Sequence, residues 1–461
     1  MGRMAAVDRL ESVPARLPAT VYRRRAIGLS LVWLLLLGNA AAIVFLWVHG
    51  GNLEKGDTAD VLTSIARITG LLSAYLALIQ VVMLARIPAL DRLVGFDRLT
   101  VWHRWNGHAC IDLVIAHVVF SVWGYALMDR FALGKEISTM IGGGVYPGMI
   151  TATVGTAFLI AVVATSVVIA RRRLPYEWWY AVHLLAYAGI ALAWFHQIPT
   201  GNELVLDTVA ADYWRALYIA TIALLCVVRI GGPLWTNVRH RLRVVAVQPE
   251  GPGVVSLRIG GHGLERLGAR AGQFFSWRFL AGGRWWTAHP FSLSEKPGET
   301  LRISVKALGD HSARLADVPV GTRVIVEGPF GTFTEASRRR RKLLLVAGGI
   351  GITPVRALME EVDGDVVVLY RAVSDEDVVF RAELDDLARN RNLELHYLIG
   401  DHMADEFSHL LTPDHLREVV PDLDERDVYV CGPPAMTNFA VASARAAGVP
   451  RRHIHAERFA L

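Results

Sequence analysis

The stretch WNGHACIDLVIAHVVFSVWGYALM, residues 105–128, decides the architecture of this chain. Apart from its histidines, its only acidic or basic residue is Asp112. A helix that spans a membrane needs about 20 mostly apolar residues, so this stretch is long enough to cross one. Comparable stretches lie at 26–48, 62–85, 150–170, 177–197 and 213–230. The sequence therefore predicts an all-α bundle of six transmembrane helices over residues 26–235, preceded by a tail at 1–25.

The composition of the whole chain agrees with a membrane protein. Hydrophobic residues make up 53% of the 461 residues and charged residues only 20%, whereas a soluble chain is about 25% charged. The net charge of +5 is too small to indicate nucleic acid as a partner. The three cysteines lie far apart, which excludes a disulfide scaffold and any four-cysteine zinc or iron–sulfur site.

The basic residues alternate between the loops of the predicted bundle. One set of connections is rich in arginine: Arg23–Arg25, then Arg86, Arg92, Arg98 and Arg104, then Arg171–Arg173, then Arg239, Arg241 and Arg243. The other set has few positive charges. The positive-inside rule then places the N-terminus and the second half of the chain in the cytoplasm. We expect a multi-pass protein of the cell membrane, because a soluble six-helix bundle would not explain this alternation.

Four histidines occupy two of the predicted helices. His103 and His117 lie 14 residues apart, which leaves their rings about 40° from a common face at 3.6 residues per turn. His183 and His196 lie 13 residues apart, which leaves the second ring about 140° off the first. Either the fifth helix is irregular near its outer end, or its side chains reach around it.

Both helices start on the cytoplasmic side, so the histidines form two pairs at two matched depths. Each pair can clamp one planar metal macrocycle, and imidazole suits iron. The pattern predicts two b-type haems, on His103 with His183 and on His117 with His196. A hydrogen-bonded packing role is the alternative, favoured for His108. A bare metal ion would need carboxylate or thiolate ligands at that depth, where only Asp112 is near.

Arg67 lies in the second helix near its outer end. A charge at membrane depth is costly unless it is paired. Arg67 either interacts with propionates of the outer haem or provides a positive wall for a small acceptor. Alternatively, it snorkels to the outer interface.

Residues 236–337 read as an antiparallel β-barrel after a helix stop at Gly231–Pro233. Strands with alternating polarity recur between glycine-rich turns. A hydroxyl beside an aromatic ring can bind a flavin, and a helix start can hold a pyrophosphate. The predicted FAD-binding residues are His289, Pro290, Phe291, Ser292, Ser304, Val305, Lys306, His311 and Ser312.

Residues 338–461 read as an α/β domain with a parallel sheet. The strand Lys342–Ala347 runs into a glycine turn and a helix, an arrangement that lets a backbone approach a phosphate. The pattern is GxGxxP, so the Rossmann fingerprint is not met. The predicted nucleotide-binding residues are Gly348, Gly349, Gly351, Thr353, Pro354, Arg371, Cys431, Gly432 and Pro433.

Taken together, these motifs resemble the ferric reductase and NADPH oxidase superfamily over nearly the whole chain beyond residue 25. The histidine spacings are similar to those of its haem-bearing domain, and the second half resembles its ferredoxin–NADP reductase module. The resemblance implies that NADPH passes a hydride to FAD, and that electrons then reach an outer acceptor through two haems. Glu457-Arg-Phe459 looks like the terminal aromatic motif that covers the flavin, so Phe459 is expected to move aside during turnover.

The sequence also departs from the family pattern. Ser121 stands where superoxide-forming members often carry a further histidine, and Gly189 where several have an aromatic residue. No EF-hand loop precedes the membrane part, so direct calcium control is not expected. The short N-terminal tail is typical of a simple bacterial-type enzyme.

Several alternatives stay open at this stage. The acceptor is oxygen, slightly favoured, or a ferric chelate or another outside electron carrier. Arg371 favours NADPH, whereas Asp375 and Glu376 favour NADH.

The basic run Arg338–Lys342 is a solvated patch or a contact with anionic lipid. A redox sensor without turnover is disfavoured by the intact motifs. We expect membrane lipid and a small acceptor as partners, and the sequence indicates neither protein partners nor oligomeric state.

Overall fold

The structure is a computed structural model that describes residues 19–53, 56–142, 144–167, 174, 176–200, 202–205, 207–281, 287–401 and 407–458. The chain divides into two compact units. One holds residues 27–229, and the other holds residues 1–26 and 230–461. Each unit is described by itself.

Six helices in the described residues are long and apolar enough to cross a membrane, which confirms the predicted number. They span Ala26–Asn52, Thr58–Met83, Arg98–Met128, Met149–Ser166, Trp178–Thr200 and Thr208–His240. Large apolar side chains such as Leu31, Leu34 and Leu35 are exposed along the first of them. A lipid-facing surface has this composition, because the surrounding hydrocarbon is as apolar as leucine.

The helices of the first unit are α1 (Ala19–Trp47), α2 (Thr58–Met83), α3 (Pro88–Val94), α4 (Phe96–Met128), α5 (Leu133–Gly142), α6 (Met149–Ser166), α8 (Tyr176–Thr200), α9 (Asn202–Val205) and α10 (Thr208–Leu225). The carboxylates of Asp57 and Asp207 cap α2 and α10 by accepting backbone N–H groups of their first turns. The third long helix begins at Phe96 rather than at 105. The apolar stretch marks only part of this helix, and residues 96–104, which mix apolar residues with Asp97, Arg98 and Arg104, extend it.

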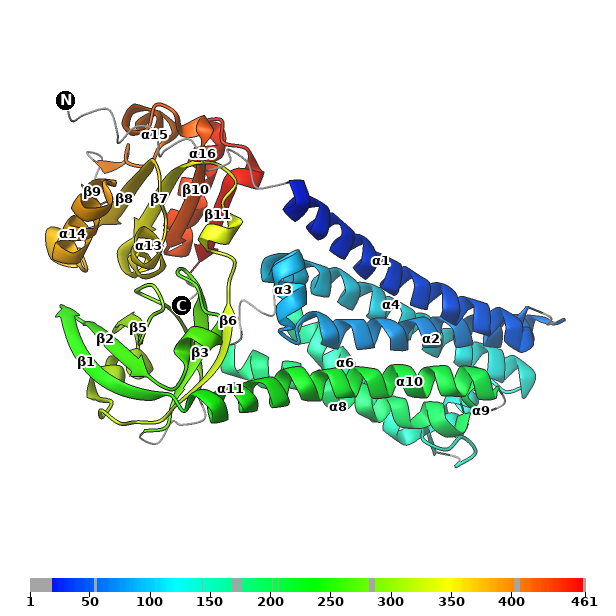
Figure 1. Ribbon diagram of the computed structural model, residues 1–461. Helices are drawn as coiled ribbons and strands as arrows, with labels where there is room; N and C mark the ends of the chain where they lie inside the picture. Colours follow the sequence, from blue (N-terminus) through cyan, green and yellow to red (C-terminus); the bar gives the residue numbers. More distant parts are fainter. Residues whose placement is uncertain are drawn as a thin grey trace, which may run out of the picture. The chain divides into compact units, whose positions relative to one another are not determined.

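Two helix pairs pack together in this unit: α2 lies beside α4, and α6 beside α8 (Figure 1). The second pair meets at Gly155 and Gly189. A Cβ added to Gly155 would lie 2.7 Å from the carbonyl oxygen of Gly189. Small residues allow backbones to approach this closely in membranes.

The second unit begins with α11 (Gly232–His240) and a barrel of six antiparallel strands. The strands are β1 (Arg243–Gly251), β2 (Val254–Gly260), β3 (Phe274–Phe279), β4 (His289–Ser292), β5 (Leu301–Lys306) and β6 (Val324–Phe330). They form two sheets, ordered β1-β2-β5 and β4-β3-β6. Bridges between Arg243 and Arg323 and between Leu293 and Ile303 join the sheets. Their inner residues make one apolar core around Phe275, Trp277 and Leu293.

A five-stranded parallel sheet follows, ordered β11-β10-β7-β8-β9 (Figure 1). Its strands are β7 (Lys342–Gly348), β8 (Val366–Ala372), β9 (Glu394–Ile399), β10 (Arg426–Gly432) and β11 (Ile454–Arg458). The helices are α12 (Asp310–Ala313) in the barrel, and α13 (Ile352–Met359), α14 (Arg381–Arg391), α15 (Pro413–Val419) and α16 (Pro434–Ala446) around the sheet. This architecture confirms the predicted fold class.

Helices cover both faces of the parallel sheet. Leu343 and Leu345 of β7 face α13 and α14, whereas Leu344 and Val346 face α15 and α16. Burial on both faces explains why β7 reads as a continuous apolar run. The core on the α13 side also includes Val254, Ala271 and Phe333 from the barrel segment, so these residues join the barrel to the sheet.

Candidate functional site

The four predicted histidines come together in two pairs inside the bundle. The ring centroids of His103 and His183 lie 6.1 Å apart, and those of His117 and His196 lie 6.2 Å apart. Helices α4 and α8 supply one member of each pair. The structure therefore pairs the histidines as their depths in the sequence predict.

Helix α2 holds both histidines of α4 through its backbone. Nδ1 of His117 lies 2.8 Å from the carbonyl oxygen of Ala66, and Nδ1 of His103 lies 3.2 Å from that of Gln80. A carbonyl oxygen only accepts, so each Nδ1 carries the proton and each Nε2 keeps its lone pair. Ala66 and Gln80 are 14 residues apart, the same spacing as the two histidines.

The histidines of α8 are held at Nδ1 as well. The ring of His183 stacks on Trp179 at 4.9 Å, and its Nδ1 lies 3.4 Å from Oγ of Ser166. Trp179 also donates its indole N–H to Ser166. Nδ1 of His196 donates to the carbonyl oxygen of Ala193, three residues earlier. All four rings thus use Nδ1 for a protein contact.

This arrangement fits a metal macrocycle between the rings of each pair. A metal–imidazole bond is about 2 Å long, so two bonds and two rings of roughly 1 Å radius separate the centroids by roughly 6 Å. Ring centroids at 6.1 and 6.2 Å match that separation. The described residues contain no group of three or more His, Cys, Asp or Glu side chains that could hold a bare metal ion.

The 13-residue spacing of α8 needs no break in the helix. The structure shows α-helix throughout Tyr176–Thr200, with Pro199 in the last turn. Both ring pairs nevertheless form, so the side chains reach around the helix. Gly148, at the start of α6, lies against the backbone of His196, since a Cβ there would be 2.7 Å from its Cα.

Two polar residues that the sequence reasoning did not single out support His103. Gln80 donates from Nε2 to the carbonyl oxygen of His103 at 2.9 Å. Asn106 donates to Oε1 of Gln80 at 2.6 Å and to the carbonyl oxygen of Leu76 at 2.8 Å. An amide inside an apolar span was the available signal, because buried amides need partners.

Arg67 follows Ala66 directly, and its guanidinium donates to Oδ1 of Asn52 at 3.0 Å. Asn52 is buried at the end of the first span, where its carbonyl oxygen also accepts from Ser64. The positive charge of Arg67 is therefore stabilised by the side-chain oxygen of Asn52. Arg67 is next in the chain to Ala66, whose carbonyl oxygen contacts His117. Its proposed role toward an acceptor remains a prediction.

In the barrel, the predicted flavin motif lies on β4. The rings of His289 and Phe291 stack at 6.2 Å, and Pro290 is exposed. The hydroxyl of Ser292 is buried and has no hydrogen-bond partner among the described residues. Buried hydroxyls rarely lack partners, so this group fits a bound flavin that supplies one. Burial lowers the pKa of His289, which favours its neutral form.

Other predicted flavin residues have partners within the protein. Ser304 shares hydrogen bonds with Ser256 and Ser294, and Val305 belongs to the barrel core. Nζ of Lys306 lies 3.1 Å from Oδ1 of Asp377 in the nucleotide domain. Ser312 accepts from the N–H groups of Leu308 and Gly309. The side chain of His311, and Phe459 as a whole, lie outside the described residues.

The two predicted glycine turns meet at the carboxyl ends of β7 and β10. A Cβ on Gly351 would lie 2.4 Å from the carbonyl oxygen of Cys431, and a Cβ on Gly432 would lie 3.2 Å from Cα of Gly348. These neighbouring strands are where the strand order reverses, the usual place for a ligand in such a sheet. Thr353 and Pro354 are buried in the first turn of α13, and Pro433 precedes α16.

The thiol of Cys431 is fully buried. Burial and the nearby Glu457 raise its pKa, so it stays protonated. Glu457 pairs with Cys431 in register between β10 and β11. The carboxyl group thus reaches the same edge of the sheet as the glycine turns.

Arg371, predicted to face a 2′-phosphate, is turned toward the sheet. Its Nη1 donates to the carbonyl oxygen of Leu398 at 2.9 Å and to that of Ala372. The segment after β8 carries Asp375, Glu376 and Asp377, and Asp375 pairs with Arg381.

The basic run Arg338–Lys342 makes contacts inside the nucleotide domain. Arg338 bonds to the carbonyl oxygen of Asp363 at 2.8 Å, and Lys342 pairs with Asp422 and Glu425 at 2.7 Å each. Arg340 donates to the carbonyl oxygen of Arg426. These contacts favour a structural role over binding of anionic lipid.

A buried ion cluster that the sequence did not reveal connects the barrel to the nucleotide domain. Arg302 of β5 makes two 2.9 Å hydrogen bonds to the carboxylate of Glu383 on α14. Arg356 of α13 reaches the same carboxylate at 2.7 Å. Both arginines also donate to the carbonyl oxygen of Ser294. The side chains of Arg302 and Arg356 are only 2% and 8% exposed.

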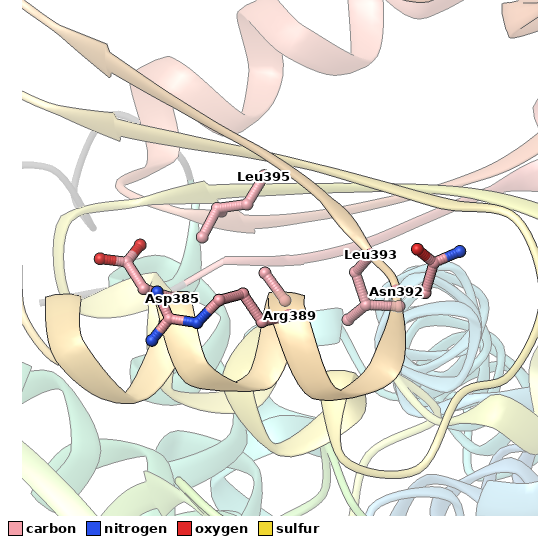
Figure 2. A pocket seen from close by; sticks show the side chains of 6 residues that line it. Asp385, Arg389, Asn392, Leu393 and Leu395 are labelled. Carbon is pink, nitrogen blue, oxygen red and sulfur yellow. The ribbon is translucent and has the colours of Figure 1, made fainter.

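A surface hollow on α14 and β9 lies apart from these residues (Figure 2). Asp385 and Arg389 come from α14, Asn392 and Leu393 follow the end of that helix, and Leu395 of β9 lies across from it. Leu395 is at the amino end of β9, whereas the glycine turns are at the carboxyl ends of their strands. The hollow is therefore no part of the nucleotide site.

Two family descriptions match this chain. Residues 69–194 match the ferric reductase like transmembrane component, and residues 345–442 match the oxidoreductase NAD-binding domain. The first range contains three of the four paired histidines, His103, His117 and His183. The second contains both glycine turns.

Individual relatives are also reductases by name. NADH-cytochrome b5 reductase 1 of Candida glabrata is 31% identical over 203 residues, which cover 40% of this chain and 70% of that protein. An NADPH oxidoreductase of Mycobacterium tuberculosis is 30% identical over 252 residues, covering 50% of this chain and 63% of that protein, less than two thirds of its length. The flavohaem-like FAD/NAD binding domain of a nitric oxide dioxygenase from Vibrio cholerae aligns with a TM-score of 0.39 at 24% identity, covering 48% of this chain and 99% of that one.

Proposed function

Since this chain belongs to the ferric reductase and NADPH oxidase superfamily, with a ferric reductase transmembrane domain and a flavin- and NAD(P)H-binding reductase module, we propose that it carries electrons from a cytoplasmic nicotinamide coenzyme across the cell membrane. It is a multi-pass transmembrane oxidoreductase. The proposal adds two b-type haems to the bound FAD, and an acceptor on the outer face.

The two histidine pairs carry this proposal. Each pair has its ring centroids 6.1 or 6.2 Å apart and each Nδ1 in a protein contact, which leaves Nε2 for a metal. His103 with His183 would hold one haem, and His117 with His196 the other. Haem iron, when bound, accepts and releases one electron at a time.

The residues of the protein set the properties of these ligands. The carbonyl oxygens of Ala66 and Gln80 fix the tautomers and raise the basicity of His117 and His103. Burial inside apolar helices excludes water, which tunes a redox potential. In the reductase module, the glycine turns let a backbone approach the coenzyme phosphates, and Ser292 provides a hydroxyl to the flavin.

For the acceptor, we propose oxygen, reduced to superoxide. Arg67 follows the residue that holds His117, so its positive charge lies near the outer pair and favours an anionic product. A ferric chelate is the second candidate, because the transmembrane half matches a ferric reductase description.

For the coenzyme, we infer NADH in preference to the NADPH that the sequence favoured. A 2′-phosphate needs a free basic group near the end of the second strand, whereas an acidic residue there suits the free ribose hydroxyl of NADH. Arg371 is bonded to the carbonyl oxygen of Leu398, and Asp375, Glu376 and Asp377 follow it. Comparing kcat/KM for the two coenzymes tests this inference, and a preference for NADPH contradicts it.

The central test uses His117→Leu in the full-length protein. The variant should keep reduction of the bound flavin by the coenzyme and lose reduction of membrane-impermeant acceptors on the outer face. Survival of outer reduction would show that electrons take another route.

An anaerobic difference spectrum of membranes separates the acceptors. Haem bands that appear with NADH or NADPH and vanish rapidly in air support oxygen, with superoxide then assayed directly. Bands that persist in air but vanish with ferric chelate support the second candidate. Haem that only dithionite reduces contradicts the proposed path from the coenzyme.

A further inference from the structure

Helix α13 lies between the two ligand-binding elements of the reductase module. Its first residue, Ile352, directly follows the glycine turn Gly348–Gly351, here called the coenzyme turn. Its other end contacts the barrel segment that follows β4, here called the flavin strand. Every residue of α13 is buried. One short, packed helix therefore bridges the coenzyme turn and the flavin strand.

Arg356 of α13 uses each nitrogen of its guanidinium group for a different partner. Nη1 donates to the carbonyl oxygen of Ser294 at 2.9 Å, and Nε donates to the carboxylate of Glu383 at 2.7 Å. Nη2 lies 2.9 Å from Oε1 of Glu360. The side chain of Arg356 is buried, so water competes little for these bonds. An arginine can make all three contacts because its donors point in fixed directions from one plane.

Two carboxylates that follow α13 hold the backbone of the barrel as well. Glu360 accepts from the backbone N–H of Lys296, and Glu361 accepts from that of Ala271 at 3.2 Å. With Arg356, the helix thus contacts the barrel at three points, and each barrel partner is a backbone atom. A backbone atom cannot rotate away as a side chain can, so these contacts fix the position of the barrel segment.

The segment that Arg356 contacts is itself held firmly against β5. The carbonyl oxygen of Arg302 accepts from the N–H of Ser294 at 2.8 Å, and its guanidinium donates to the hydroxyl and carbonyl oxygens of Ser294 at 3.1 Å each. Ser294 is fully buried. It lies two residues after Ser292, whose buried hydroxyl has no partner among the described residues. The place of Ser294 therefore determines where the flavin strand ends.

We propose that α13 is a rigid spacer that sets the distance between the coenzyme turn and the flavin strand, with Arg356 as its main positioning residue. This inference rests on the proposed function, because it concerns hydride transfer from the coenzyme to the bound flavin, which moves two electrons and one proton. A misplacement of about 1 Å can lower the rate of such a step about 100-fold. Arg356 acts through Ser294 and α13, and not on the reacting atoms.

The test is anaerobic stopped-flow reduction of the bound flavin by NADH and by NADPH in the purified full-length protein. Arg356→Lys keeps the positive charge beside Glu383 but offers one nitrogen in place of three. We expect the limiting rate, per bound flavin, to fall about tenfold. The Kd of the coenzyme, taken from the concentration dependence, should change less than about twofold, because its contacts at the glycine turn are retained.

Arg389→Lys on α14 is the matched control. Arg389 is exposed and pairs with Asp386, so this variant should keep the wild-type limiting rate and Kd. If Arg356→Lys does not fold, as judged by circular dichroism, Glu361→Ala replaces it. That change leaves Arg356 intact and removes the acceptor of the Ala271 N–H. It should lower the limiting rate by a smaller factor, again without a change in Kd.

A limiting rate within about twofold of the wild type in the tested variant would overturn the inference. A purely structural contact would give that result together with a lower Tm. A raised Kd with an unchanged limiting rate would also overturn it, since Arg356 would then act in coenzyme binding. A wild-type flavin that neither NADH nor NADPH reduces would instead contradict the proposed function, and the wild-type measurement alone decides that point.

Discussion

Gly70 of α2 lies directly against the ring of His117 on α4. A Cβ added to Gly70 would come 2.7 Å from Nδ1 and 2.9 Å from Cε1 of that ring. The same Nδ1 donates to the carbonyl oxygen of Ala66, one turn earlier on α2. Helix α2 therefore sets both the tautomer and the position of His117.

We predict that Gly70→Ala displaces His117 and removes the haem that we propose it holds with His196. An added methyl group in a packed site costs about 1–3 kcal/mol, and here the side chain that must yield is a proposed haem ligand. The pyridine haemochrome of the purified protein should show about half of the wild-type haem. Gly38→Ala on α1, where nothing lies within 4 Å of the added Cβ, is the control. Full haem content in Gly70→Ala would contradict the prediction.

Gly351→Ala should separate the two nucleotide turns. Its Cβ would lie 2.4 Å from the backbone carbonyl oxygen of Cys431, and a backbone atom cannot rotate away. A displacement of about 1 Å near reacting groups can lower the rate about 100-fold. We expect a loss of that order in kcat/KM for the coenzyme, with unchanged flavin content by absorbance. Gly298→Ala, in open space, should retain wild-type kinetics. Wild-type kinetics in Gly351→Ala would show that the turns tolerate the shift.

Glu383→Gln should destabilise the contact between the barrel and the nucleotide domain. The change removes the carboxylate that the buried guanidinium groups of Arg302 and Arg356 share. Arg302 keeps Glu295 at 3.5 Å and Arg356 keeps Glu360 at 2.9 Å. Losing one partner of a buried pair costs about 3–5 kcal/mol, and because Glu383 is 37% exposed we expect about 1–3 kcal/mol.

Chemical denaturation of the purified protein, followed by flavin fluorescence, measures this loss. Asp386→Asn on the same helix removes an exposed pair with Arg389 and should cost less than about 0.5 kcal/mol. Equal effects of the two substitutions would mean that the buried cluster contributes no more than a surface pair.

The stability of the reductase module should fall between pH 6.5 and pH 4. Burial lowers the pKa of His455 to about 4, and its ring stacks on Tyr429 at 4.4 Å. The unfolded chain binds a proton near the ordinary pKa of about 6.5, which the folded chain resists until about 4, so acid favours unfolding in that range.

His455→Phe keeps the stacked ring and removes the titrating group. Denaturation at pH 7 and at pH 5 should therefore show a smaller loss for this variant than for the wild type. His396→Phe, at a more exposed position, should retain the wild-type loss. The same loss in His455→Phe and the wild type would assign the acid sensitivity to other groups.

Much of the architecture follows from pattern alone. Twenty-residue apolar stretches predict spans because lipid imposes their length, and β7 reads as a buried parallel strand because both its faces are covered. Helix ends were less predictable. Phe96–Arg104 continues α4 ahead of the apolar stretch, because Asp97, Arg98 and Arg104 interrupt the apolar pattern without breaking the helix.

The site was predictable where residue type limits the chemistry. Histidines inside a membrane and glycines before a helix have few other uses, and the structure brings both sets together. The partners of those residues were not predictable. Gln80, Ser166 and Glu383 are common residue types, and only packing between distant segments gives them a role. The bacterial type, the cell membrane and the orientation of the helices stay predictions.

The backbone of α2 fixes the spacing between the two histidines of α4. The carbonyl oxygens of Ala66 and Gln80 are as many residues apart as the two rings that they hold. A single-residue insertion between positions 66 and 80 would rotate one oxygen by about 100° and shift it by about 1.5 Å, so one histidine would lose its partner while the other kept it. Natural relatives should therefore vary in length at the ends of α2 and almost never within this segment.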